Sequence, residues 1–266
     1  MPMLKTGIFV DAENIRICGG YGMRYNVLAS LAGCGHSVLL RANSYIAEDR
    51  ERTKDPEYRT KLYHYQDVIR QCGFKVIKKF VKHFLDDEGI LTTKANADMD
   101  LAIDALLQAR NLDRIILLTG DGDFVRLILA LQNMGCRVEV IGFKNVSNAL
   151  RETADSYTSG YLIPGLLPVT SSENGEELKG RLRGVAVSYK ADRGFGFMRY
   201  YSLSEQGLSP ETLFFHCSQA VDVHDSMFLD SSNIFEFSLY RNPGNENRLE
   251  AREIRHVTGD RPEHVS

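Results

Sequence analysis

The sequence lacks any apolar run of the roughly 18 residues that a transmembrane helix needs. The N-terminus also lacks a basic region followed by a signal-like apolar stretch. The five cysteines are widely spaced and odd in number, and they form no Cys-x-x-Cys pair, which disfavours a disulfide framework and a zinc site. We therefore expect a cytoplasmic protein with free thiols and no membrane contact.

Excess positive charge is absent as well. Lys and Arg total 32 against 35 for Asp and Glu, so the formal net charge is −3. The field of the whole molecule does not attract nucleic acid, and any such binding needs local patches. The hydrophobic content of 43% and the 266 residues are typical of a globular protein with one large domain or two ordinary ones.

An apolar run from Ile115 breaks at Thr119-Gly120, is followed by Asp121 and Asp123, and continues as an amphipathic helical pattern. This pattern predicts a strand, an acidic turn and a helix. Ligands of open α/β sheets bind outside the carboxyl ends of the strands, so both acids are candidate metal ligands. Capping of the following helix is the alternative, and it explains one Asp better than two.

The same pattern occurs near the N-terminus, where a short apolar run ends in Asp11 and Asn14 follows one turn later. Helix capping is again the alternative for Asp11. A third acidic region begins a helical pattern after Lys94, where Asp98 lies in the first turn and Asp100 and Asp104 share one face.

Five strands alternating with helices predict a doubly wound, mostly parallel sheet over residues 1–163. The expected strands cover residues 6–11, 37–46, 74–84, 115–118 and 136–143, and Ser147 is expected to cap a helix that runs to about Tyr157. The lysine-rich third strand is interpreted as a sheet edge, with a phosphate-binding rim as the alternative. Asp11, Asp98, Asp121 and Asp123 can converge only if the first and fourth strands are neighbours.

Three motifs in this order resemble the NYN domain, specifically the LabA-like branch of the PIN-like nuclease superfamily. They are Phe9-Val10-Asp11-Ala12-Glu13-Asn14, Lys94 with Asp98 and Asp104, and Thr119-Gly120-Asp121-Gly122-Asp123-Phe124. The resemblance covers residues 5–163 and implies a metal-dependent ribonuclease fold.

Carried over by position, the resemblance assigns Asp11, Asp98, Asp121 and Asp123 as ligands of Mg²⁺ or Mn²⁺. It assigns Asn14 to placing substrate or a metal-bound water, and Asp104 as a further catalytic acid. Such an ion offsets charge on the phosphoryl group and lowers the pKa of a bound water. No histidine falls in these motifs, so the sequence supplies no evident general base.

Residues 164–179, rich in Pro, Ser and Gly, have the composition of a linker. Short strands without intervening helices then predict a small all-β barrel over residues 180–257, and residues 258–266 form a tail. Two aromatic clusters on adjacent strands predict a stacking platform for single-stranded RNA, rimmed by cations. The expected RNA-binding residues are Lys190, Arg193, Phe195, Phe197, Arg199, Phe215 and His216, with Arg183 also on the rim. The alternative is that these aromatics form the barrel core.

The segments 193–198 and 213–218 resemble the two RNA-binding motifs of the cold-shock domain, an OB-fold. Two departures stand out, a long loop expected from Tyr200 to Glu211 and the absence of tryptophan from the whole chain, so a usual stacking position is filled otherwise or lost.

The leading hypothesis is a metal-dependent ribonuclease whose barrel captures single-stranded RNA. A non-catalytic module that binds RNA or protein through a PIN-like scaffold is the alternative, and a small-nucleotide or phosphate-ester hydrolase is a third. An isologous homodimer is the default expectation for such a domain.

Overall fold

The computed structural model describes residues 3–85, 91–94, 97–169, 180–242 and 245–259. Contacts divide the chain into two compact units, the first formed by residues 1–21, 25–142 and 146–157 and the second by residues 22–24, 143–145 and 158–266. The expected linker lies outside the described residues from 170 to 179, and the expected tail from 260 onward. The expected domain boundaries stay a prediction. No helix within the described ranges is long and apolar enough to cross a membrane.

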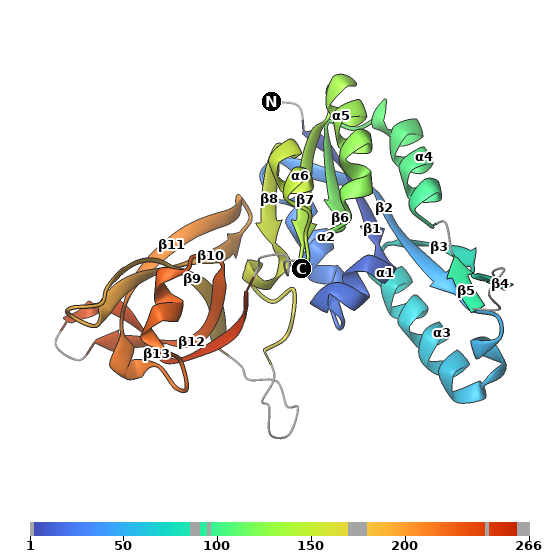
Figure 1. Cartoon of the computed structure of the whole chain (residues 1–266). Coiled ribbons are helices and arrows are strands. Elements are labelled where there is room, and N and C mark those ends of the chain that lie inside the picture. Colours follow the sequence, from blue (N-terminus) through green and yellow to red (C-terminus); the bar gives the residue numbers. More distant parts are fainter. Residues whose placement is uncertain (1–2, 86–90, 95–96, 170–179, 243–244, 260–266) are drawn as a thin grey trace. The chain divides into compact units, whose positions relative to one another are not determined.

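A six-stranded sheet with helices forms the α/β part of the chain, in the order β3-β2-β1-β6-β7-β8 (Figure 1). The pairs β3-β2, β2-β1, β1-β6 and β6-β7 are parallel. The strands are β1 (Leu4–Asp11), β2 (Ser37–Glu48), β3 (Lys75–Phe80), β6 (Arg114–Leu118), β7 (Arg137–Gly142) and β8 (Ser156–Ser159). This order confirms the predicted fold class. It also makes the first and fourth expected strands neighbours, which is the condition for the acids to converge.

Helices connect the strands, as parallel strands require. They are α1 (Ala12–Ile15), α2 (Tyr25–Gly33), α3 (Pro56–Gln71), α4 (Ala97–Ala109), α5 (Val125–Asn133) and α6 (Asn148–Thr153). Shorter helical turns are η1 (Arg16–Gly20), η2 (Arg52–Lys54), η3 (Gly122–Phe124) and η4 (Gly160–Leu162).

Both faces of the sheet are buried, which explains why its strands are apolar without strict alternation. Phe9, Ile115 and Leu117 pack in one cluster with residues of α4 and α5. Their neighbours along the strands, Ile8 and Ile116, are also fully buried and point to the opposite face.

The helix expected from Ser147 to about Tyr157 is shorter than predicted. It ends at Thr153, and β8 follows as a sixth strand of the sheet. The helix ends because Asp155 forms two hydrogen bonds with the backbone of β7 and cannot continue the helix. The backbone N–H of Asp155 donates to the Val138 carbonyl at 2.9 Å, and the Asp155 carboxylate accepts from the Val138 N–H at 2.7 Å.

The lysine-rich stretch also differs from the single strand expected over 74–84. It divides into β3 and β4 (Lys82–Leu85), and β4 pairs with β5 (Leu91–Lys94) in a separate two-stranded sheet. β3 is an edge strand, as interpreted from its lysines. Lys78 pairs with Glu48 at 2.9 Å and Lys79 with Asp100 at 2.8 Å, so these two ammonium groups are already neutralised.

The second unit contains a closed five-stranded barrel in the order β10-β11-β13-β12-β9 (Figure 1). Its strands are β9 (Arg181–Lys190), β10 (Phe195–Ser204), β11 (Gly207–His216), β12 (Asn233–Asn242) and β13 (Asn245–Gly259), with the turns η5 (Cys217–Gln219) and η6 (Asp225–Leu229). The β11-β13 pair is parallel and the other pairs are antiparallel. This barrel is consistent with the expected OB-fold.

The long loop expected from Tyr200 to Glu211 does not form. β10 and β11 continue through it as a hairpin whose last pair is Ser204 with Gly207. The residues between the two resembling segments thus extend both strands, and residues 204–206 at the tip of the hairpin are exposed.

Candidate metal and nucleic-acid sites

The first candidate site lies at the carboxyl ends of β1 and β6. Val10 pairs with Leu118, so Asp11 and the segment from Thr119 leave adjacent strands at the same edge of the sheet. The carboxyl ends of adjacent parallel strands lie at the same edge of the sheet, whichever face each side chain points to. The adjacency of β1 and β6 therefore meets the condition for the acids to converge.

Asp11 and Asp121 both cap helical turns, so the capping alternative is correct for each of them. Asp11 Oδ1 accepts from the Asn14 N–H at 3.1 Å, and Asp121 Oδ1 accepts from the Asp123 N–H at 3.0 Å. Each cap uses one carboxylate oxygen. Capping and a further role are therefore compatible, because the second oxygen of each group stays outside the cap.

Thr119 joins the two acidic turns, and the sequence interpretation assigned it no role. This fully buried side chain donates from Oγ1 to Asp11 Oδ2 at 3.2 Å and accepts from the Asp121 N–H at 3.1 Å. A buried polar residue directly after an apolar strand is the signal that could have revealed it. Thr119 fixes the orientation of the Asp11 carboxylate.

Asn14 also connects the same two turns, through a side-chain hydrogen bond. Its Oδ1 accepts from the backbone N–H of Gly120 at 2.8 Å. The Gly120 carbonyl accepts from the Ser147 N–H at 2.9 Å, and a Cβ on Gly122 would lie 2.8 Å from Ser147 Oγ. Asn14 thus positions the acidic turn through its side-chain oxygen, and a larger residue at 122 would displace the Ser147 hydroxyl.

The four predicted metal-binding acids influence one another electrostatically. Burial raises the pKa of Asp11 to about 6, with further contributions from the charges of Asp98 and Asp121, while hydrogen bonds from Asn14 and Thr119 act in the opposite direction. Partial burial and then the charges of Asp121 and Asp123 raise the pKa of Asp98. The structure therefore brings Asp11, Asp98, Asp121 and Asp123 into one region of concentrated negative charge.

The donor set suits a hard divalent cation. Within the described ranges none of these four carboxylates forms an ion pair with Lys or Arg, so their mutual repulsion is not relieved by the protein. In the same ranges, no three acidic, His or Cys side chains are already grouped closely enough to hold a metal ion. Asp98 and Asp123 are exposed, and their side chains can rotate toward a cation. Oxygen ligands in this number fit Mg²⁺ or Mn²⁺.

Asp104, which the resemblance assigned as a further catalytic acid, is hydrogen-bonded to a tyrosine. Its Oδ2 accepts from the hydroxyl of Tyr45 at 2.9 Å, and that hydroxyl in turn accepts from the Asn43 amide at 3.1 Å. Asp100 is held by Lys79. Neither acid is among the groups that shift the pKa of Asp11 or Asp98. Both acids anchor α4 to neighbouring strands.

The turn η1 borders the acidic site. Burial and then the charges of Asp11 and Asp121 raise the pKa of the Cys18 thiol. This turn has π-helical hydrogen bonding, and Cys18 and Gly19 depart from helical backbone angles. Such turns occur often at functional sites.

The second candidate site is an aromatic face on β10 and β11. The register pairs Phe195 with His216 and Phe197 with Phe214, which places all four rings on the outer side of these strands. The Phe195 and Phe214 centroids lie 5.8 Å apart and those of Phe197 and Phe214 lie 6.2 Å apart. Phe197 is 40% exposed. We call Phe195, Phe197, Phe214 and His216 the aromatic face.

Phe215 does not belong to this face, and its predicted role in stacking is wrong. It is fully buried in the barrel core, stacked on Tyr189 and 4.7 Å from the Phe228 ring. A Cβ on Gly196 would lie 2.2 Å from the Ser188 carbonyl oxygen and 2.7 Å from the Phe215 ring, so glycine is needed where β10 passes between β9 and the core. The core alternative holds for Phe215, whereas Phe214, its neighbour, faces outward.

Three of the four predicted rim cations lie near the aromatic face, and Arg183 does not. The Lys190 ammonium lies 5.7 Å from the centre of the Phe195 ring, and Arg199 and Arg193 are exposed. Arg199 alternates with Phe195 and Phe197 along β10 and therefore shares their side. Arg193 lies in the turn before β10, 3.7 Å from Asp192.

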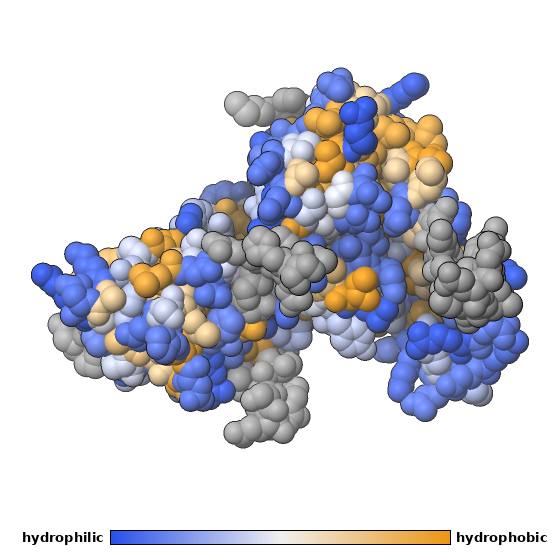
Figure 2. Space-filling model, viewed as in Figure 1, coloured by the Kyte–Doolittle hydropathy of each residue, from blue (hydrophilic) through white to orange (hydrophobic). Residues whose placement is uncertain are grey.

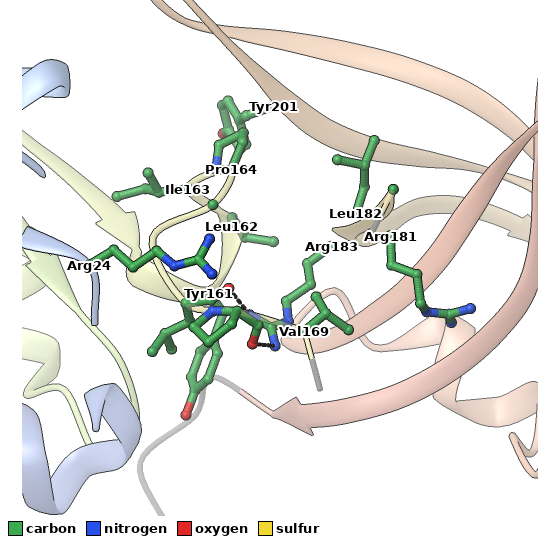
Figure 3. Close-up of a pocket in the computed structure, with 14 residues that line it drawn as sticks. Arg24, Tyr161, Leu162, Ile163, Pro164, Val169, Arg181, Leu182, Arg183 and Tyr201 are labelled. Carbon is green, nitrogen blue, oxygen red and sulfur yellow. Dashed lines mark hydrogen bonds between the residues drawn. The ribbon is translucent and has the colours of Figure 1, made fainter. Parts of the chain in front are cut away.

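Arg183 is not part of the rim. It lines a cavity of about 240 Å³ in the second unit, where its guanidinium donates to the carbonyls of Leu167 and Pro168, each at 3.2 Å (Figure 3). Burial lowers its pKa. Its charge is therefore used to satisfy backbone carbonyls.

The α/β part of the chain is similar to known proteins. Residues 5–166 match the model of the NYN domain. The Low amplitude and bright protein LabA of Synechococcus elongatus is 29% identical over 160 residues, covering 58% of this chain and 82% of that protein. The crystal structure of a protein of unknown function from Vibrio parahaemolyticus is 26% identical, with a TM-score of 0.50, and covers 59% of this chain and 93% of its own. Because the family model spans more than half of the sequence, the chain belongs to the NYN domain family.

Proposed function

We propose that this protein is a cytoplasmic ribonuclease that hydrolyses phosphodiester bonds of single-stranded RNA with Mg²⁺ or Mn²⁺, and that its barrel captures the RNA. The observation that carries the proposal is the convergence of Asp11, Asp98, Asp121 and Asp123 at one edge of the sheet, without compensating cations in the described residues. Membership of a PIN-like nuclease family supports the same reaction class.

The protein supplies a fixed and a movable part of the site. Thr119 and the Asn14 N–H hold the buried Asp11 carboxylate in one orientation, whereas Asp98 and Asp123 are exposed. Bound here, a divalent ion would offset negative charge on the phosphoryl group and lower the pKa of a water. The four acids would hold it, and the Asn14 bond to Gly120 would keep the two turns in register.

The aromatic face supports the RNA-capture part of the proposal. In OB-folds the second and third strands carry the oligonucleotide-binding face, and here these strands are β10 and β11. Stacking on such rings contributes about 1–3 kcal/mol per base and is tolerant of sequence. Lys190 and Arg199 lie beside the rings and can contact phosphates.

The test is incubation of the full chain with labelled single-stranded RNA and Mn²⁺ or Mg²⁺, beside Asp121→Asn. Asp67→Asn is the matched control, because Asp67 is exposed on α3 and pairs only with Arg70 in its described surroundings. We expect cleavage by wild type and by the control, and a rate lower by about 100-fold or more for Asp121→Asn. Equal cleavage by Asp121→Asn and wild type would sink the assignment.

A non-catalytic RNA-binding module is the competing function. The observation that favours it is that, within the described ranges, the side chains are not already grouped as a metal site. It predicts RNA binding that is unchanged in Asp11→Asn or Asp121→Asn and no metal-dependent turnover by wild type. The same assay therefore separates the two functions.

A further inference from the structure

Helix α4 has an apolar side that faces solvent. Its core side is buried through Leu101, Ala105 and Ala109. On the opposite side lie four large apolar residues that are 36–69% exposed, namely Met99, Ile103, Leu106 and Leu107. A surface helix normally has one apolar side, which faces the core, and α4 has a second one. The exposed side of α4 therefore has the composition of an interface.

Hydrophobic surface gathers over the part of the first unit where α4 and α5 lie side by side (Figures 1 and 2). Leu129 of α5 is also exposed. Single exposed apolar residues are common on proteins, but contiguous patches mark interaction sites.

The spacing of the exposed side is that of a helix-pairing seam. Met99, Ile103, Leu106 and Arg110 are separated by four, three and four residues, so they form one stripe. The stripe is self-complementary when two copies run antiparallel. Ile103 of one copy then lies opposite Leu106 of the other, and Met99 opposite Arg110. The apolar residues meet in the centre and the charged residues lie at the ends.

Charge selects the antiparallel direction. The first turn of α4 carries Asp98 and Asp100, whereas exposed Arg110 directly follows its last residue and forms no ion pair within the described part of its own chain. Antiparallel pairing brings Arg110 of each copy to the acidic turn of the other. Parallel pairing would bring like charges together.

We propose that α4 joins two copies of this chain in an antiparallel, two-fold symmetric dimer centred between Ile103 and Leu106. The pairing is isologous, so both copies use the same surface. It places Arg110 of the second copy beside the turn that carries Asp98. The dimer does not depend on nuclease activity, and it can be tested whether or not RNA is cleaved.

The first experiment is sedimentation equilibrium of the full chain. We expect a mass of twice 30.0 kDa for wild type. Ile103→Glu places a charge in the centre of each half of the seam and should weaken dimerisation by about 100-fold or more. The matched control is Leu40→Glu, which changes an exposed leucine on β2 and should leave the dimer intact. Circular dichroism confirms that each variant is folded.

A charge reversal tests the direction of pairing. Arg110→Asp should weaken the dimer by about tenfold, because the substitution occurs at both ends and brings like charges together, whereas Arg110→Lys keeps the positive charge and should weaken it less. A wild type that sediments at 30.0 kDa at every concentration, an Ile103→Glu variant with unchanged dissociation constant, or equal weakening by Arg110→Asp and Arg110→Lys would overturn the proposal.

Discussion

The acidic edge of the sheet and the aromatic face of the barrel were both predicted from short motifs, yet their predictions fared differently. Asp11 and Asp121 lie at strand ends, where the chain leaves the sheet and side-chain parity is unimportant. Phe214 and Phe215 lie within a strand, where neighbouring residues point to opposite faces. A sequence motif therefore locates a residue at a strand end reliably. Within a strand, an error of one residue places a core side chain on the surface, or a surface side chain in the core.

The two regions also differ in the interactions that hold their side chains in place. At the acidic edge Thr119 and Asn14 are committed to holding backbone and carboxylate, so the buried part of the site is rigid. On the barrel the outer rings pack mainly against one another. The first region is expected to respond to pH and metal ions, and the second to loss of aromatic area.

The largest effect on stability should come from Phe215→Ala, which tests the separation of core from face. Removing a fully buried ring leaves a cavity beside Tyr189 and Phe228, and we expect a loss of about 3–5 kcal/mol in the free energy of unfolding of the barrel. Urea denaturation followed by circular dichroism measures it, with Phe214→Ala as the control. Similar losses for the two variants would contradict the assignment of sides.

Asp11→Asn should stabilise the protein at neutral pH. The pKa of Asp11 is about 6 in the folded state, above its usual value of 3.8, so between these pH values the folded state binds more protons than the unfolded state. The free energy of unfolding therefore falls as pH rises from about 4 to about 6 and stays lower above that. Asn keeps an oxygen acceptor for the Asn14 N–H without the charge, and its amide N–H can donate to Thr119 Oγ1 in place of the hydrogen bond that Asp11 accepts. We expect a gain of up to about 3 kcal/mol at pH 7, fading toward pH 4.

Denaturation at both pH values, with Asp67→Asn as the control, measures this gain. Added Mg²⁺ or Mn²⁺ should raise the melting temperature of wild type more than that of Asp11→Asn, because the ion binds only the folded acids. A stability difference that is the same at pH 4 and pH 7 would show that Asp11 is not destabilised by its charge.

The smallest of the three effects is the loss of RNA affinity in Phe214→Ala. Removing one stacking ring should raise the dissociation constant for single-stranded RNA by about tenfold, from a contribution of roughly 1–3 kcal/mol per base. Fluorescence anisotropy with labelled RNA measures it. Tyr240→Ala removes an exposed ring on β12, outside the aromatic face, and should leave affinity unchanged. Equal losses for the two variants would remove the aromatic face as the binding site.

The sequence by itself determined the alternation of strands and helices in the first unit, the acids at the ends of β1 and β6, and the all-β character of the second unit, because hydrophobic period and turn residues are local properties. Only the tertiary structure decided which groups those side chains meet. Asp104 meets Tyr45, and Phe215 meets Phe228 in the core. Each of these outcomes depends on a partner far along the chain and on strand register, so no local pattern could specify it.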